Sequence, residues 1–164
     1  MISRRTMFAL SALSVAALCL PEFTPALVLI NLTSSVPVGL YLALPGRPAA
    51  GDYVRVATSD QTHALAVSRG YIVPGLPLLK RAAAIAGSRV CRSGSGVWID
   101  GHIQVWVRRI DRAGRALPVW SECRVLKAGE IFVLGSHRDS YDGRYFGPIP
   151  LSQGITRVVP IWLF

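Results

Sequence analysis

The chain has 164 residues and a mass of 17.7 kDa, which suits one domain with a short appendage and excludes an enzyme with a separate cofactor domain. Hydrophobic residues make up 51% of the chain and charged residues 16%, so intrinsic disorder is excluded as its main state. Eighteen Lys and Arg against nine Asp and Glu give a formal charge of +9, which favours anionic partners, nucleic acid or acidic lipid head groups, without choosing between them.

An export or anchoring segment is predicted at the N-terminus. Two arginines precede an uncharged apolar run at residues 7–20, the order found in an export signal. The run is long enough to cross a bilayer only if it continues to residue 30. Because no small-residue cleavage site follows it, we interpret residues 1–30 as an uncleaved inner-membrane anchor and residues 31–164 as a periplasmic domain. The alternative is a periplasmic protein after signal cleavage.

Antiparallel β-structure is predicted for most of the chain beyond this segment. Asp100-Gly101 separates two alternating apolar runs, and this dipeptide is a strong signal for a hairpin turn. Pro160 restricts the last run to a sheet edge or a bulge, because proline has no N–H to donate. The predicted strands are residues 53–57, 97–99, 103–107, 131–134 and 156–162.

One short helix is predicted at residues 60–69. Thr58 or Ser59 supplies the N-cap hydroxyl, and Gly70 stands where a helix commonly ends. Residues 112–118 are rich in turn formers, so this connection is expected to be an exposed arm.

The cysteines predict a disulfide rather than a metal site. Cys91 and Cys123 can pair in an oxidising compartment, which leaves Cys19 over in the apolar run. The alternative is a pair of buried free thiols. The three histidines and the two distant cysteines do not have the spacing of zinc ligands. No metal and no other cofactor is expected.

Three polar segments carry the candidate chemistry. Residues 31–41 offer three hydroxyls, although an ordinary polar turn also explains them. Residues 74–81 end in Lys80, one of only two lysines, and a buried lysine can lose its proton where arginine cannot. The alternative is a solvated surface lysine. Residues 135–148 combine acidic, basic and hydroxyl groups beside aromatics, which a surface loop with an ion pair also explains.

Together these segments offer a nucleophile, a base and an orienting network, as in the Ser/Lys variant of serine hydrolases. At these residues the chain resembles the type I signal peptidases, and within them the conjugative-transfer peptidases of the TraF type. The resemblance covers residues 31–162. It is carried by Asn31-x-Thr33-x-Ser35-x-Pro37-x-Gly39-Leu40-Tyr41, Lys80-Arg81 and Asp142-x-Arg144-Tyr145-Phe146-Gly147-Pro148.

The resemblance implies a role for each matching side chain. Ser35 corresponds to the nucleophile and Lys80 to the general base. Thr33 corresponds to the hydroxyl that forms the oxyanion hole together with the Ser35 backbone N–H. Ser140 corresponds to the hydroxyl that orients the lysine.

The third segment supplies the supporting ion pair and contains one of two departures from the family pattern. Asp142 and Arg144 correspond to the ion pair beneath the lysine. The serine that usually stands between them is Gly143, and the usual Pro-Gly-Asp after the lysine strand is Ala86-Gly87-Ser88. Neither departure replaces a primary catalytic group.

The fold implied is mainly β, an antiparallel scaffold of the signal peptidase type with one short helix and an N-terminal transmembrane anchor. The activity implied is that of a serine endopeptidase. We expect the protein to be a monomer and to need no cofactor. It would cut a membrane-anchored precursor, a pilin precursor of a conjugative transfer system, after small side chains. The expected partners are this precursor and the lipid surface, not nucleic acid.

Three alternatives remain from the sequence. The first is a catalytically inert periplasmic β module of a transfer apparatus, supported by the departure at residues 86–88. The second is a basic domain that touches DNA, which the lack of a recognition helix and of interleaved aromatic and basic residues disfavours. The third is a Ser-His-Asp hydrolase that uses His102 or His137.

Overall fold

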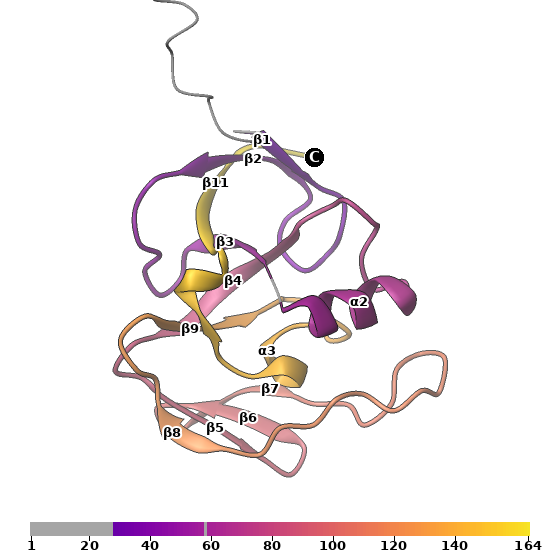
Figure 1. Cartoon of the computed structure of the whole chain (residues 1–164), viewed down its shortest axis with the longest axis vertical. Helices are drawn as coiled ribbons and strands as arrows, with labels where there is room; N and C mark the ends of the chain where they lie inside the picture. Colours follow the sequence, from indigo (N-terminus) through magenta and orange to yellow (C-terminus); the bar gives the residue numbers. More distant parts are fainter. Residues whose placement is uncertain (1–27, 58) are drawn as a thin grey trace, which may run out of the picture.

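The computed structural model describes residues 28–57 and 59–164, and the strands among them form two antiparallel sheets (Figure 1). The larger sheet is curled and has seven strands in the order β1-β2-β11-β3-β4-β9-β10. Its strands are β1 (Val28–Asn31), β2 (Gly39–Leu44), β3 (Tyr53–Val56), β4 (Leu78–Ile85), β9 (Glu130–Leu134), β10 (Ile149–Pro150) and β11 (Thr156–Leu163).

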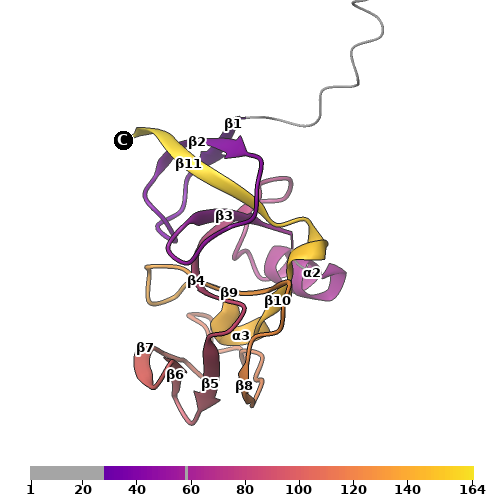
Figure 2. The same ribbon diagram turned by 90° about the vertical axis from the view of Figure 1, so that its left-hand side faces the viewer.

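The smaller sheet is formed entirely by the chain between β4 and β9, which are themselves paired neighbours. Its strand order is β7-β6-β5-β8, and it lies at the end of the molecule opposite β1 (Figures 1 and 2). A long connection from β7 to β8, residues 107–122, is called the arm below. The strands are β5 (Arg89–Ser93), β6 (Gly96–Ile99), β7 (His102–Trp106) and β8 (Cys123–Val125).

The helical segments are short. The predicted helix is confirmed as α2 (Asp60–Ser68), where the Ser59 side chain accepts a hydrogen bond from the backbone N–H of Thr62. Gly70 follows with φ of 69°, a conformation that glycine adopts without a steric penalty. Beyond the single helix that was predicted, α3 (Gly143–Phe146) and the 3-10 turn η1 (Leu151–Gln153) follow β9.

Two local predictions about the strands are also confirmed. Asp100 and Gly101 have φ angles of 51° and 82° and connect β6 directly to β7, as a two-residue hairpin turn requires. In β11 the pairing with β2 shifts register between Pro160 and Trp162. The proline therefore lies next to a bulge and beyond the residues of β11 that pair with β3, where its missing N–H is tolerated.

The boundary predicted at residue 30 needs correction. Residues 28–30 pair with residues 40–42 of β2, so the end of the apolar segment belongs to the folded sheet. The reason is that an exposed apolar strand and a membrane segment have the same composition. The remainder of the predicted anchor lies outside the described residues. No helix within residues 28–57 and 59–164 has the length and hydrophobicity needed to cross a bilayer.

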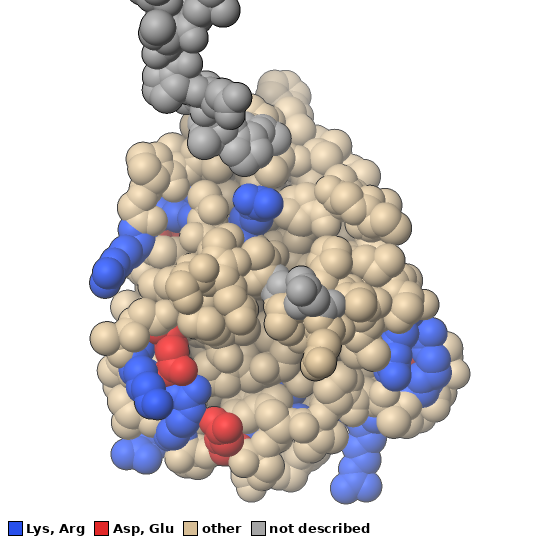
Figure 3. Space-filling model, in the orientation of Figure 1, with Lys and Arg blue, Asp and Glu red and all other residues tan. Residues whose placement is uncertain are grey.

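Apolar side chains pack between the sheets but also remain exposed at one end. Strands β3 and β9 contribute fully buried members of the core, Val54, Ile131 and Phe132. At the other extreme, β1 and β11 expose several large apolar side chains beside both ends of the described chain, and Figure 3 shows this end as largely uncharged. These residues, called the apolar edge, are Val28, Ile30, Leu32, Ile161, Trp162, Leu163 and Phe164.

The two cysteines of the smaller sheet are joined in the structure. Cys91 on β5 and Cys123 on β8 are direct cross-strand partners, with Cα atoms 3.9 Å apart, and form a disulfide. Cys123 immediately follows the arm. The bond therefore attaches the end of the arm to the middle of the smaller sheet.

Candidate active site

Ser35 lies in a tight loop between β1 and β2 that is shaped by one asparagine. Asn31, the last residue of β1, is buried, and its Nδ2 donates to three carbonyl oxygens of the loop. From the other end of the loop, the Tyr41 hydroxyl donates to the Pro37 carbonyl at 2.6 Å. These bonds satisfy backbone groups that the turn leaves without strand partners. The acceptors of Asn31 are the carbonyl oxygens of Thr33 at 2.8 Å and of Val36 and Pro37 at 3.0 Å.

The segment after β9 holds the Ser35 loop against the sheet. The backbone N–H of Ser136 donates to the Ser35 carbonyl at 2.8 Å, and the Ser136 hydroxyl also donates to it at 3.1 Å. Gly135 leaves no space for a side chain, because a Cβ there would collide with the Ser140 side chain and lie 3.2 Å from the Ser35 Cβ. A glycine at this position therefore allows the two loops to approach closely.

Lys80 reaches Ser35 from an interior strand. It lies on β4, which is paired with β3 on one side and β9 on the other, and follows the buried residues Leu78 and Leu79. Only 2% of Lys80 is exposed. Its Nζ lies 2.6 Å from the Ser35 Oγ. The lysine and the serine, 45 residues apart in sequence, are thus in direct hydrogen-bond contact.

Burial changes the protonation of this lysine. Removal from water disfavours the ammonium form and lowers the pKa of Lys80 to about 8. The nearby charges oppose each other, since Asp142 raises this pKa and Arg144 lowers it. Desolvation therefore dominates, and Lys80 can be neutral in mildly alkaline solution. A neutral amine beside a hydroxyl is the arrangement that a general base requires.

Ser140 adds a second hydroxyl to the pair. Its Oγ lies 2.9 Å from the Ser35 Oγ, and either oxygen can donate. The resemblance assigned this residue to the lysine, whereas the structure places its side chain directly on the serine. When the Ser35 proton points toward Lys80, Ser140 can donate to the Ser35 oxygen. The hydroxyl then keeps that oxygen in position.

Asp142 and Arg144 form a buried pair behind these residues. The Asp142 carboxylate accepts from the backbone N–H of Gly135 at 2.7 Å and from the Arg144 Nη2 at 2.7 Å. The guanidinium also donates to the carbonyls of Gly135, His137 and Arg138. Every contact links two parts of the same segment, residues 135–144. The pair therefore fixes the segment that carries Ser140.

The structure gives a physical reason for the departure at Gly143. A Cβ at this position would lie 2.6 Å from the Val133 carbonyl oxygen and 2.8 Å from the Phe132 ring. Side chains do not approach that closely, so a serine would require this ring or the backbone to move. The aromatic ring thus occupies the space that a serine side chain would need.

The other departure lies away from Ser35. Residues 86–88 form the turn between β4 and β5, at the start of the smaller sheet. Gly87 has φ of 94°, and its N–H donates to the Leu126 carbonyl at 3.0 Å. The turn forms without the proline and aspartate of the family pattern. The lysine strand still pairs with β3 and with β9, the latter with one register shift between Ala82 and Ala84.

Thr33 faces the same space as Ser35 and Lys80 but has a partner of its own. The residue is exposed and lines the cavity in front of the pair. Its hydroxyl donates to the Asn31 Oδ1 at 2.9 Å. To serve as an oxyanion donor, this hydroxyl would have to turn from Asn31 toward the bound carbonyl.

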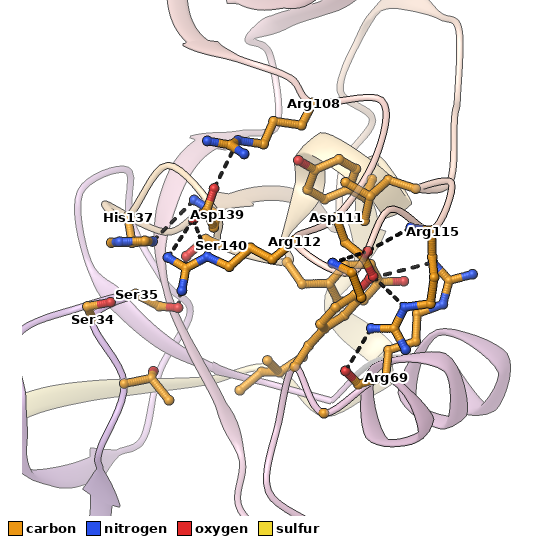
Figure 4. Close-up of a pocket in the computed structure, with 18 of the residues that line it drawn as sticks. Ser34, Ser35, Arg69, Arg108, Asp111, Arg112, Arg115, His137, Asp139 and Ser140 are labelled. Atoms are coloured by element: carbon orange, nitrogen blue, oxygen red, sulfur yellow. Dashed lines mark hydrogen bonds and ion pairs between the residues drawn. The ribbon is translucent and has the colours of Figure 1, made fainter.

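Two cavities meet at Ser35. The arm cavity, about 590 Å³, lies between the Ser35–Lys80 pair and the arm, which supplies Leu117 and several charged residues (Figure 4). The strand cavity, about 810 Å³, lies on the other side of the loop, against Tyr53 of β3 and Arg81 of β4. Both include Ser34 and Ser35. An extended peptide could therefore pass Ser35 with its two ends in different cavities.

The histidines do not form a triad with Ser35 within the described residues. His137 lines the arm cavity, where its Nδ1 accepts from the Asp139 N–H at 3.2 Å. His63 lies on α2 and His102 on β7, both exposed. In the described structure, Ser35 Oγ is hydrogen bonded to the side chains of Lys80 and Ser140. The described residues also contain no cluster of three or more groups suited to a metal ion.

Comparison of the sequence with known protein families identifies the family of this chain. The family model "Signal peptidase, peptidase S26" matches residues 3–163, almost the whole chain. The chain belongs to this family.

The individual relatives are plasmid and conjugal transfer proteins. The chain is 33% identical to the plasmid transfer protein TraF of Escherichia coli over 143 residues, 80% of this chain and 81% of the relative. It is 35% identical to the conjugal transfer protein TraF of Agrobacterium fabrum over 146 residues, 82% of each chain. A probable conjugal transfer protein TraF of Sinorhizobium fredii is 38% identical over 133 residues, 74% of this chain and 69% of the relative. Family and relatives together support a peptidase-like role in conjugation.

Proposed function

We propose that this protein is a membrane-associated serine endopeptidase that cleaves a precursor protein with a Ser35–Lys80 dyad. The observation that carries the proposal is the 2.6 Å contact between the Ser35 Oγ and a lysine Nζ that is almost completely buried. Such burial of a lysine is costly unless its neutral form is used. The dyad is the use that this geometry supports best.

The reaction follows from these contacts. Neutral Lys80 accepts the Ser35 hydroxyl proton while the Oγ attacks the scissile carbonyl carbon. The resulting oxyanion is stabilised by the Ser35 backbone N–H and by Thr33 once its hydroxyl has turned from Asn31. The lysine then returns the proton to the leaving amine, and the carbon–nitrogen bond breaks. Water, deprotonated by Lys80, releases the acyl group from Ser35 in the second half of the cycle.

The apolar edge supports a position at a lipid surface. Its side chains belong to β1 and β11, and β1 ends at Asn31, four positions before the nucleophile. An extended chain spans at most ~3.6 Å per residue, so Ser35 stays close to this edge. We propose that the apolar edge rests on the periplasmic face of the inner membrane. A membrane-held precursor would there present its cleavage point to Ser35.

The substrate that we propose is a pilin precursor of a conjugative transfer system. The relatives that carry conjugal or plasmid transfer names support this choice. From the family resemblance, we expect the precursor to have small side chains at its cleavage point. The enzyme would act on this partner as a monomer and without a cofactor.

The test is cleavage of the pilin precursor from the same transfer system by the full-length protein in detergent, followed by mass spectrometry. Ser35→Ala and Lys80→Ala should each abolish the product. Two matched variants serve as controls, because Ser34 is the exposed neighbour of Ser35 and Lys127 is the other lysine. Ser34→Ala and Lys127→Ala should retain most of the activity. A Ser35→Ala protein that still cleaves would overturn the dyad, and an inactive unmodified protein would favour an inert module of the transfer apparatus.

A further inference from the structure

The charged side chains around Ser35 are distributed unequally between the two cavities. The described residues that line the strand cavity include one charged side chain, that of Arg81. The arm cavity contains four arginines and two aspartates besides Lys80. Their side chains form two groups in Figure 4, one around Asp139 and one around Asp111. The arginines are Arg69, Arg108, Arg112 and Arg115.

Asp139 is surrounded by more positive charge than it can balance. Arg108 Nε lies 2.9 Å from one of its oxygens and Arg112 Nη2 lies 2.7 Å from the other, while Arg138 Nε is 3.9 Å away. The hydrogen bond from Arg112, with the attraction of Arg108, lowers the pKa of Asp139, so this carboxylate stays ionised at neutral pH. Arg108 and Arg112 line the arm cavity together with Asp139, whereas Arg138 lies outside its lining. One negative charge therefore faces two guanidinium groups, and a net charge of about +1 remains at this side of the cavity.

These arginines still have donors available for a ligand. A guanidinium has five N–H donors, and one carboxylate occupies only part of those on Arg108 and Arg112. The Arg112 side chain is 75% exposed and that of Arg108 is 40% exposed. Both line the same cavity as Ser35 and Lys80. A carboxylate entering the cavity could thus accept bidentate hydrogen bonds without displacing Asp139.

The other group of charges keeps the arm in place. Asp111 accepts from the Tyr71 hydroxyl at 2.6 Å and from Arg115 Nε at 2.7 Å. Arg69, at the end of α2, donates to the Ala116 carbonyl at 2.7 Å. The tip of the arm is therefore attached to α2 and its neighbouring loop. These hydrogen bonds fix the arm, so its arginines face the cavity from a well-defined position.

We propose that the cluster of Arg108 and Arg112 around Asp139 binds acidic side chains of the precursor on one side of the scissile bond. This inference rests on the proposed peptidase function and adds a substrate class to it. An acidic peptide segment is favoured over lipid head groups because Arg108 and Arg112 line the same cavity as Ser35, where the peptide must lie to be cut. The arm that carries them leaves the smaller sheet, which lies at the opposite end of the molecule from the apolar edge (Figures 1 and 2).

The experiment uses three quenched fluorescent peptides and the full-length protein in detergent. All three contain one central run of alanine and serine. The first has three aspartates before this run, the second has three after it, and the third has neutral flanks. Because the cluster lies in only one cavity, one aspartate peptide should have a kcat/KM about tenfold above the neutral peptide at low ionic strength. This ratio should approach one in ~0.5 M NaCl, where exposed charges are screened.

The variants assign the preference to the cluster. Arg108→Gln and Arg112→Gln should each lower the acidic-to-neutral ratio of kcat/KM by about threefold or more. Arg112→Lys keeps the charge and should keep most of the ratio. Arg47→Gln removes an exposed arginine on the loop after β2, outside both cavities that contain Ser35, and should leave the ratio as it is. A ratio near one in the unmodified protein, or one that survives both glutamine substitutions, would overturn the proposal.

A binding measurement separates this inference from the proposed function. The Ser35→Ala protein is titrated with the same peptides, and fluorescence anisotropy reports their affinities whether or not the unmodified protein cleaves them. Tighter binding of one aspartate peptide, lost in Ser35→Ala with Arg112→Gln, supports the acidic subsite even if no peptide is cut. Equal affinities for all three peptides reject it. Cleavage without a charge preference would reject the subsite and leave the peptidase intact.

Discussion

Two assemblies of aspartate and arginine lie near Ser35, and their distances are almost the same. Asp142 and Arg144 approach to 2.7 Å, as do Asp139 and Arg112. The first pair is 0% and 2% exposed, whereas the side chains of the second are 16% and 75% exposed. In the buried pair the donors and acceptors are used within one segment, so it sets a geometry. In the exposed group, donors remain free and salt can screen the charges, so it can respond to a ligand.

The largest effect should come from Lys80, which depends on the buried geometry. Arginine would keep the positive charge and much of the length but cannot release its proton. We therefore expect Lys80→Arg to lower kcat/KM by more than about 10³-fold, as Lys80→Ala does, because a general base is lost. Single-turnover cleavage of the precursor measures the loss. Substantial turnover by Lys80→Arg would show that the lysine acts only as a positioning charge.

Two alanine substitutions, Asp142→Ala in the buried assembly and Asp139→Ala in the exposed one, compare the two assemblies directly. Asp142→Ala leaves the Arg144 guanidinium buried without its counter-ion and should lower the free energy of unfolding by about 3–5 kcal/mol. Urea denaturation followed by tryptophan fluorescence measures this difference. If Asp142→Ala lowered the free energy of unfolding by less than about 1 kcal/mol, the difference in burial would not give the two assemblies different effects on stability.

A third effect concerns the stability cost of Lys80 itself. Below pH 8 the folded protein contains a buried ammonium, which Lys80→Met removes. We expect this variant to be more stable than the parent by about 3 kcal/mol at pH 7, because each tenfold change in proton affinity corresponds to ~1.4 kcal/mol. Between a folded pKa of about 8 and the ordinary value of 10.5, the unfolded chain binds more protons at this group. The stability of the parent therefore rises with pH through this window.

Urea denaturation at pH 7 and near pH 10 tests this sign. The advantage of Lys80→Met should shrink at the higher pH, whereas Lys127→Met, at an exposed position, should change stability little at either pH. An advantage that is constant with pH would mean that the gain comes from packing and not from the charge.

The pH dependence of cleavage follows from the same group. Because only neutral Lys80 can accept the Ser35 proton, kcat/KM should rise about tenfold per pH unit well below pH 8 and level off above it. Initial rates on a neutral peptide between pH 6 and pH 9.5 give the profile. A flat profile across this range, with unchanged peptide binding, would contradict the general-base role.

The smallest effect is expected at the exposed assembly. Asp139→Ala removes a screened, partly solvated carboxylate, so the free energy of unfolding should change by less than about 1 kcal/mol. The same substitution exposes more positive charge in the arm cavity and should strengthen binding of an aspartate peptide. Denaturation and anisotropy on one preparation measure both quantities. A loss of stability comparable to that of Asp142→Ala would show that solvent does not weaken this group.

The sequence predicted those parts of the fold that depend on local chemistry. The Asp100-Gly101 turn, the helix after Ser59 and the irregularity at Pro160 are each determined by backbone preferences of one or two residues. Strand β1 was assigned instead to the apolar segment, because its consecutive Val28, Leu29 and Ile30 lack the alternation of apolar and polar residues that indicates a strand. Its partner β2 gave no separate signal.

The candidate site was predicted in part for a different reason. Ser35, Lys80 and Ser140 could be proposed from motif order, and the structure brings them together. The sequence did not predict that Asn31 shapes the Ser35 loop, although this residue begins the first motif. Its three hydrogen bonds to the loop carbonyls exist only in the folded turn. The arm was expected to be exposed, yet Leu117 is buried and the arm forms a cavity wall. Such long-range packing leaves no periodic pattern in the sequence.

The connection from β4 to β9 has a consequence for how such proteins diversify. Residues 86–129 leave the larger sheet from one strand and return to the strand that pairs with it. Within this excursion, the Cys91–Cys123 bond ties the base of the arm. Because the arm lines the cavity beside Ser35, sequence changes within this excursion can alter what the cavity accepts. The pairing of β4 with β9 and the hydrogen bonds of the serine loop lie outside the excursion.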